Sequence, residues 1–88
     1  MRKYGKVDRN HNEIVTGLRQ LGATVLSIAS IGNGAPDILV GWRGRNYLFE
    51  IKDDRGQLTD DEETFFDRWN GQVKLVRNLL DAVQEIQL

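Results

Sequence analysis

The first third of the chain combines a helical pattern of apolar residues with a β-like run. Four apolar residues follow helical spacing at i, i+1, i+4 and i+7: Ile14, Val15, Leu18 and Leu21. We therefore expect a helix over 8–21, and Gly22 is a typical residue to end it. Residues 23–31 are rich in β-branched and aliphatic side chains, which predicts a strand that ends at the Gly-Asn-Gly breaker 32–34.

The middle of the chain has the pattern of a β-hairpin. Apolar runs at 36–41 and 47–52 flank the turn sequence 43–46, and the only proline stands first in its run, where a missing N–H does least harm. Side chains alternate along a strand, so Glu50 and Lys52 should share one face while their apolar neighbours point to the other.

The last third predicts a helix, a strand and a helix. Thr59 and Glu62 have the spacing of a capping box that opens a helix ending at Asn70-Gly71. Its expected buried stripe is Phe65, Phe66 and Trp69. Residues 72–76 form the fourth strand, and Asn78 caps a last helix. The apolar positions of that helix are Leu79, Leu80, Val83 and Ile86. We expect one α/β domain over 1–88, in the order α-β-β-β-α-β-α, with a central mixed sheet flanked by helices.

Composition narrows the chemistry of any metal site. The 88 residues include no cysteine, which excludes disulfides and thiolate zinc sites, and the single histidine, His11, argues against an imidazole-rich site. A bound metal should therefore be a hard cation held by oxygen, such as Mg²⁺ or Mn²⁺. No apolar run approaches the roughly 18 residues of a membrane span, so we expect a soluble cytoplasmic protein. A core this small also favours a homodimer, with Trp42, Leu79 and Leu80 as candidate contacts.

Charge is unevenly distributed along the chain. The net charge of −1 argues against a generic nucleic-acid binder, which is usually basic. Residues 1–52, however, carry eight Lys/Arg and four Asp/Glu, whereas residues 53–88 carry four Lys/Arg and nine Asp/Glu. The basic half is compatible with a DNA-facing side.

The chemistry-bearing residues lie on the two strands of the expected hairpin. Antiparallel pairing would bring Asp37 close to Glu50, thirteen residues later. Two adjacent carboxylates repel, and a divalent cation would relieve that repulsion. Lys52 would then orient a nucleophilic water or neutralise charge on a phosphate. The alternative is a solvated strand end in which the carboxylates form a surface salt bridge with Lys52.

The sequence resembles the PD-(D/E)XK nuclease superfamily and, within it, the virus-type replication-repair nuclease (VRR-NUC) family, over about residues 8–86. The matching segments are Glu13, Gly34-Ala35-Pro36-Asp37, Glu50-Ile51-Lys52, Gly56-Gln57-Leu58-Thr59 and Gly71-Gln72-Val73. The resemblance implies a restriction-endonuclease-like core. It further implies that Asp37, Glu50 and the Ile51 carbonyl bind the metal, that Lys52 is catalytic, and that Glu13 reaches the metal directly or through water.

Two of the acidic residues admit a second interpretation. Glu13 could simply lie on the solvated face of its helix. Glu62 occupies a position where these nucleases usually carry glutamine, and a role in the capping box is the stronger interpretation for it.

The expected function is a Mg²⁺- or Mn²⁺-dependent DNA endonuclease, selective for branched DNA as Holliday junction resolvases are. Arg43, Arg45 and Arg55 are candidate DNA contacts. The alternatives are a flap, single-strand or nicking nuclease and, from another class, an inactive DNA-binding module.

Overall fold

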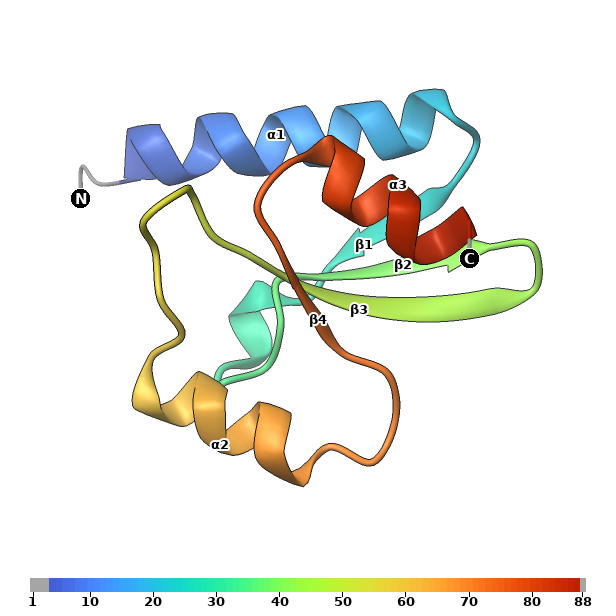
Figure 1. Cartoon of the computed structure of the whole chain (residues 1–88). Coiled ribbons are helices and arrows are strands. Elements are labelled where there is room, and N and C mark those ends of the chain that lie inside the picture. Colours follow the sequence, from blue (N-terminus) through green and yellow to red (C-terminus); the bar gives the residue numbers. More distant parts are fainter. Residues whose placement is uncertain (1–3, 88) are drawn as a thin grey trace.

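A four-stranded mixed sheet forms the centre of the molecule (Figure 1). This computed structural model describes the backbone of residues 4–87 and the side chains of residues 10–87. The strands are β1 (Thr24–Ser27), β2 (Ile38–Trp42), β3 (Arg45–Ile51) and β4 (Lys74–Val76), adjacent in that order. The β1–β2 and β2–β3 pairs are antiparallel and the β3–β4 pair is parallel, as the mixed-sheet prediction requires.

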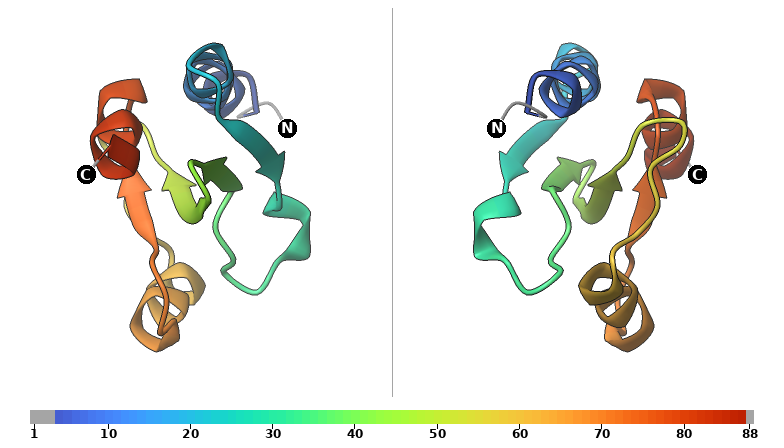
Figure 2. Two further views of the ribbon diagram at one scale, coloured as in Figure 1. Left: turned by 90° about the vertical axis from the view of Figure 1, so that its right-hand side faces the viewer. Right: turned by 90° about the vertical axis from the view of Figure 1, so that its left-hand side faces the viewer.

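The helices lie on opposite sides of this sheet. The first, α1 (Tyr4–Gln20), and the last, α3 (Leu79–Gln87), cover one face together, while α2 (Asp60–Arg68) lies beyond the other (Figure 2). The order α-β-β-β-α-β-α agrees with the sequence pattern. None of the described helices is both long and apolar enough to cross a membrane.

The hydrophobic core lies between the sheet and the α1–α3 pair. It is built from Ile14, Val15, Leu18, Ala23, Ile38, Val40, Phe49, Ile51, Val76, Ala82 and Ile86. Burial of each large aliphatic side chain stabilises the fold by about 1.5–3 kcal/mol. A glycine lets the two helices approach closely, because a Cβ at Gly17 would stand 2.4 Å from the side chain of Leu79.

The β2–β3 hairpin has the tight turn expected from its sequence. Arg43 and Gly44 have φ values of 51° and 81°, and the flanking residues Trp42 and Arg45 pair with each other. Two consecutive residues with positive φ give a turn whose twist matches that of the strands. The resulting register pairs Ile38 with Phe49, which brings Asp37 opposite Glu50.

The predicted strand over 23–31 is only half correct. It ends at Ser27 and is followed by a 3-10 turn, Ala29–Ile31. The Ile28 N–H still bonds to the Asp37 carbonyl at 2.9 Å, but beyond it the backbone bonds are local: the Ile31 N–H donates to the Ile28 carbonyl and the Ala35 N–H to the Gly32 carbonyl, each at 3.1 Å. The ladder therefore stops there. The first helix also begins at Tyr4 rather than at residue 8.

The prediction of a buried stripe on the second helix is wrong. No residue of α2, all of which is described, is buried, and Trp69, just beyond it, is 46% exposed. Phe65 and Phe66 are half-buried, and Phe65 stacks on Trp69 with ring centroids 5.0 Å apart. The helix lies away from the α1–α3 core (Figure 2), which leaves its aromatic side chains outside that core.

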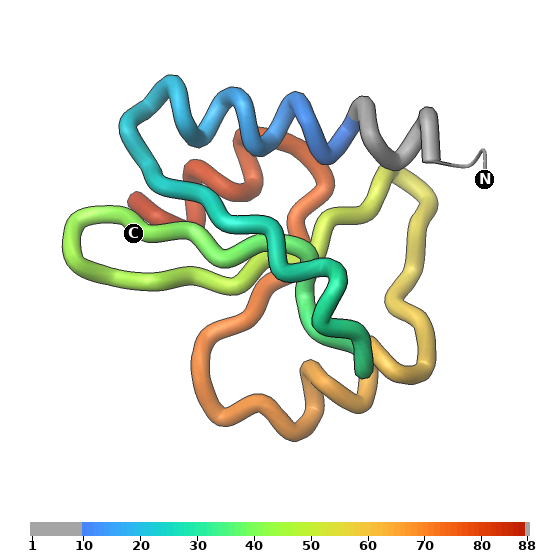
Figure 3. The backbone as a smooth tube through the Cα atoms, turned by 180° about the vertical axis from the view of Figure 1, so that it is seen from behind, coloured from blue at the N-terminus to red at the C-terminus, as the bar shows by residue number. Residues whose placement is uncertain are grey.

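The predicted helix caps are confirmed. Thr59 and Glu62 form a complete capping box, and the Asn78 side chain accepts the Asp81 N–H at 2.9 Å. Leu80, one of the candidate dimer contacts, is 63% exposed and lies outside the core. Between β3 and α2 the chain runs as a long open segment over 52–59 (Figure 3), and this segment borders the site described next.

Candidate active site

The expected carboxylate pair lies at the end of the hairpin away from its turn. Asp37 directly precedes β2, and Glu50 is the penultimate residue of β3. The Asp37 N–H donates to the Phe49 carbonyl at 3.0 Å, and the Asp37 Oδ2 accepts the Ile51 N–H at 2.8 Å. The backbone of β3 therefore fixes both the main chain and the side chain of Asp37.

A cavity of about 300 Å³ opens at this point. It is lined by Asn10, Asp37, Glu50, Ile51, Lys52, Asp53, Gly56 and Glu62. These residues come from α1, both strands of the hairpin, the segment after β3 and the first turn of α2. Positions up to 52 residues apart in sequence thus meet at one cavity, which we call the cleft.

Glu50 is the one buried charged residue among the described side chains, with 3% of its surface exposed. Burial raises the pKa of its carboxyl, and the nearby Asp37 and Glu62 carboxylates raise it further, to about 8. The ammonium of Lys52 opposes this shift without cancelling it. Without a further cation, therefore, a large fraction of Glu50 is protonated at neutral pH.

Lys52 lies between two carboxylates. Its Nζ is 2.9 Å from Glu62 Oε1 and 3.4 Å from Glu50 Oε2. Burial lowers the pKa of Lys52, but the hydrogen bond and the negative charges of these two partners outweigh burial, and the pKa is raised. Lys52 is therefore a charged donor whose head group is fixed in the cleft.

Glu62 has two structural roles at once. Its Oε1 accepts the Thr59 N–H at 2.9 Å, which completes the capping box, and the same oxygen accepts Lys52. Burial raises the pKa of Glu62, but the Lys52 and Thr59 hydrogen bonds outweigh it and lower the pKa. The capping interpretation is confirmed, and the structure adds the ion pair with Lys52.

Two further residues position the segment after β3. The Asn10 side chain donates to the Lys52 carbonyl at 3.2 Å. The Arg77 guanidinium donates to the carbonyls of Asp53 and Gly56, the latter at 2.9 Å. Neither residue was singled out from the sequence, because an Asn on a helix and an Arg after a strand carry no local signal of such contacts.

The fold is similar to that of a known protein domain. No family model and no curated protein matches the chain. A solved structure described as a VRR_NUC domain is similar to it, with a TM-score of 0.69 and 26% sequence identity over 93% of this chain and 95% of that one. The match supports assignment to the VRR-NUC family. It also supports the restriction-endonuclease-like fold and a nuclease domain.

The cleft of this VRR-NUC-like domain suits a divalent cation. Glu50 Oε1 is buried and has no hydrogen-bond partner among the described residues, and the second oxygen of Asp37 takes no part in the bond to Ile51. Oxygen donors are the ligands that Mg²⁺ and Mn²⁺ prefer. Within the part of the chain that is described, no three acidic or histidine side chains cluster closely enough to hold a metal alone. The Ile51 carbonyl, water and substrate oxygens would complete the shell.

Four other predicted site residues lie outside the cleft. Glu13 is exposed on α1 and does not line the cavity, whereas Asn10, one helical turn earlier, does. Arg55 is exposed in the segment after β3. Arg43 and Arg45 lie at the turn of the hairpin, at the far end of β3 from Glu50. The direct role of Glu13 and the DNA contacts of the three arginines remain predictions.

Proposed function

We propose that this protein is a metal-dependent DNA endonuclease that uses Mg²⁺ or Mn²⁺ and acts selectively on branched DNA. The observation that carries the proposal is the buried, unpartnered Glu50 Oε1, which lies opposite Asp37 and beside a charged lysine. A buried carboxylate oxygen without a donor is costly unless a cation binds it or the carboxyl is protonated, and a bound cation keeps it ionised.

The chain's own residues divide the work of phosphodiester hydrolysis. Asp37, Glu50 and the Ile51 carbonyl would hold the metal, which polarises the scissile phosphate and lowers the pKa of a bound water. Lys52 orients the attacking water and neutralises negative charge that develops on the phosphate. Glu62 holds the Lys52 ammonium in place, and Ile51 fixes Asp37 through its N–H.

Branched DNA is the proposed substrate because the chain resembles replication-repair nucleases, and branched DNA is an intermediate of replication and repair. Symmetric cutting of a branch requires two sites, which a homodimer would supply. Leu80 is the one of the three candidate dimer contacts that is largely exposed, since Leu79 and Trp42 pack against the core. Leu80→Arg should therefore yield a monomer by light scattering if α3 forms the dimer contact.

The test is cleavage of labelled DNA by purified protein with Mg²⁺, with Mn²⁺ and with chelator. The panel contains a four-way junction, a flap, a single strand and the matched duplex. We expect metal-dependent cutting of the junction that is lost in Asp37→Asn and in Lys52→Ala, and retained in Lys74→Ala. Lys74 is the matched control because it is an exposed lysine on β4 outside the cleft.

Each other outcome has a defined meaning. Preferential cutting of the flap, the single strand or one strand of the duplex would replace the branched substrate by that one. Binding to the junction without cutting by any variant would identify a DNA-binding module. Equal cutting by wild type and Lys52→Ala would show that the cleft is not the active site.

A further inference from the structure

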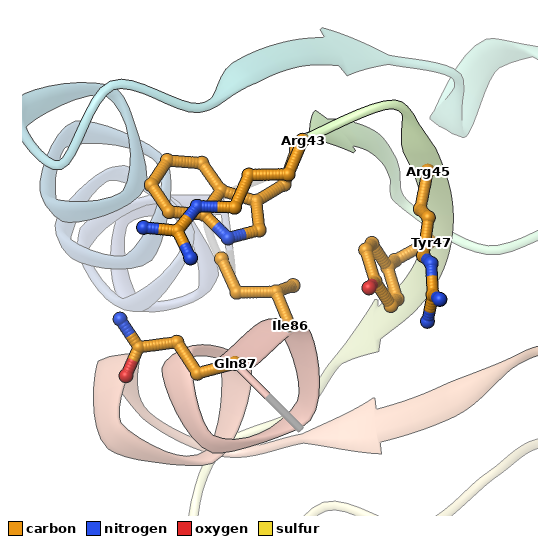
Figure 4. A pocket seen from close by; sticks show the side chains of 6 residues that line it. Arg43, Arg45, Tyr47, Ile86 and Gln87 are labelled. Carbon is orange, nitrogen blue, oxygen red and sulfur yellow. The ribbon is translucent and has the colours of Figure 1, made fainter.

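A second polar cavity lies at the turn of the β2–β3 hairpin. Its volume is about 270 Å³, and it is lined by Trp42, Arg43, Arg45, Tyr47, Ile86 and Gln87. Figure 4 shows Ile86 and Gln87 reaching it from α3, with Arg45 and Tyr47 on β3 across from them. We call it the hairpin cavity.

The polar groups around the hairpin cavity are mainly hydrogen-bond donors. None of its six lining residues is acidic, and two are arginines. All ion pairs between described side chains involve Lys52, so neither Arg43 nor Arg45 has a carboxylate partner there. Among the described residues that line it, the cavity therefore has two positively charged side chains and no acidic one.

A buried donor without an acceptor lies at the same place. The Trp42 Nε1 is inaccessible to solvent and has no hydrogen-bond partner among the described residues. A buried N–H that lacks an acceptor is destabilising. The indole N–H is therefore covered by the side chains around it, and the donors that face the cavity opening are the exposed guanidinium groups of Arg43 and Arg45.

The hairpin turn holds one of these cations against the indole. Arg43 adopts φ of 51°, a conformation uncommon for a residue with a side chain, and its guanidinium lies over the Trp42 ring, 5.0 Å from the centroid. The guanidinium is thus positioned before any ligand arrives, which reduces the entropy lost on binding.

We propose that the hairpin cavity binds a phosphate group of a DNA segment other than the one in the cleft. Phosphate oxygens accept from guanidinium and from N–H donors, which matches the lining. Arg45 is six residues from Ile51 along β3, about 20 Å at the usual strand rise. Trp42 and Tyr47 also pack toward the α1–α3 core, whereas Glu50 alternates with the core residues Phe49 and Ile51 and faces the other way. The hairpin cavity therefore lies toward the other end of β3 from Glu50 and on the other face of the sheet, which favours a separate DNA segment.

The experiment uses Trp42 as the reporter. The chain has two tryptophans, so Trp69→Phe leaves Trp42 as the only one. This variant is titrated in chelator, which prevents cutting, with inorganic phosphate, with thymidine monophosphate and with a labelled four-way junction whose anisotropy reports binding. We expect a saturable change in Trp42 emission with the junction that phosphate reverses at high concentration.

Arginine variants in the same background test the ligand contacts. Arg45→Ala and Arg43→Gly should each weaken junction binding by about tenfold and reduce the salt dependence by about one phosphate contact. Arg43→Gly also removes the backbone strain of the turn, so this variant should fold at least as well as its parent. It therefore tests the ligand contact even if Arg45→Ala folds poorly. Arg68→Ala, an exposed arginine on α2, is the control and should bind as the parent does.

Three outcomes would overturn the proposal. The first is junction binding seen by anisotropy without a change in Trp42 emission. The second is equal binding by Arg45→Ala and Arg68→Ala. The third is a Trp42 response to the mononucleotide but not to DNA, which would make the ligand a free nucleotide.

This inference rests on the proposed function in one respect, which is that DNA supplies the phosphate group. The two can fail separately, because cutting depends on Lys52 whereas the Trp42 signal does not. A Trp42 response without any cutting would support the phosphate site in the hairpin cavity and reject the nuclease. Cutting without a Trp42 response would support the nuclease and reject the phosphate site in the hairpin cavity.

Discussion

Lys52 and Glu62 form an ion pair of 2.9 Å that joins the end of the central strand to the start of α2. The same Glu62 oxygen accepts the Thr59 N–H, so one carboxylate both caps a helix and fixes the lysine of the cleft. Glutamine would retain the capping acceptor but not the charge, which makes Glu62 a residue whose two roles can be separated by substitution.

We expect Glu62→Ala to lower the free energy of unfolding by about 1 kcal/mol, because it removes half of the capping box and the partner of Lys52. Glu62→Gln should lower the free energy of unfolding clearly less, since its amide oxygen can still accept the Thr59 N–H. Urea denaturation measures both, with the exposed neighbour Glu63→Ala as the control. Equal losses in the Ala and Gln variants would mean that the charge, and not the cap, provides the stability.

Stability should fall with rising pH because of Glu50. Its pKa is raised from the ordinary 4.5 to about 8, so between these values the folded protein keeps a proton that the unfolded chain has lost. The folded state then binds more protons, and stability falls as pH rises through this window. Glu50→Gln removes this pH dependence. Its free energy of unfolding should therefore rise by about 2–4 kcal/mol relative to that of wild type between pH 5 and pH 8.5.

Mg²⁺ provides the complementary measurement at pH 8. Metal binding requires the ionised carboxylate and releases its proton, so Mg²⁺ should raise the melting temperature of wild type but not of Glu50→Gln. The exposed Glu63→Gln should behave like wild type in both experiments. Parallel pH curves for wild type and Glu50→Gln would contradict the raised pKa.

Arg77 should matter more for activity than for stability. Its guanidinium donates to the carbonyls of Asp53 and Gly56, which holds the segment directly after Lys52. Arg77→Ala should reduce kcat of the proposed cleavage by about 10- to 100-fold through misplacement of Lys52, and lower stability by only about 1 kcal/mol. Arg77→Lys should recover part of the rate, and Arg68→Ala should retain all of it. A wild-type rate in Arg77→Ala would remove Arg77 from the site.

Gly34 should tolerate no side chain. It has φ of 78°, and a Cβ there would stand 2.3 Å from the Asp61 carbonyl oxygen, so the loop before β2 packs directly on α2. Gly32 has the same φ, but nothing lies within 4 Å of its Cβ position. We expect Gly32→Ala to cost about 1–3 kcal/mol from backbone strain alone, and Gly34→Ala to cost clearly more because of the added clash, both measured by urea denaturation. Similar losses in the two variants would show that the loop moves away from α2 at little cost.

Features set by short-range interactions could be predicted from the sequence. The hairpin turn at Arg43-Gly44 and the capping box of Thr59 and Glu62 depend on residues within four positions of each other. The alternation of Glu50 with Phe49 and Ile51 follows from strand geometry alone. These local rules, with the pairing they require, were sufficient to predict Asp37, Glu50 and Lys52 at one site.

Features that depend on distant partners could not be predicted in this way. Apolar spacing indicates that one side of a helix is apolar but not what covers it, so the aromatic side chains of α2 were assigned to a core that lies on the other side of the sheet. The segment 23–31 ends its ladder early because both it and its neighbour bond within local turns there. Asn10 and Arg77 reach the cleft only because the fold brings α1 and the end of β4 to the segment after Lys52. Local chemistry determined which residues could form the site, whereas long-range packing decided which others support it.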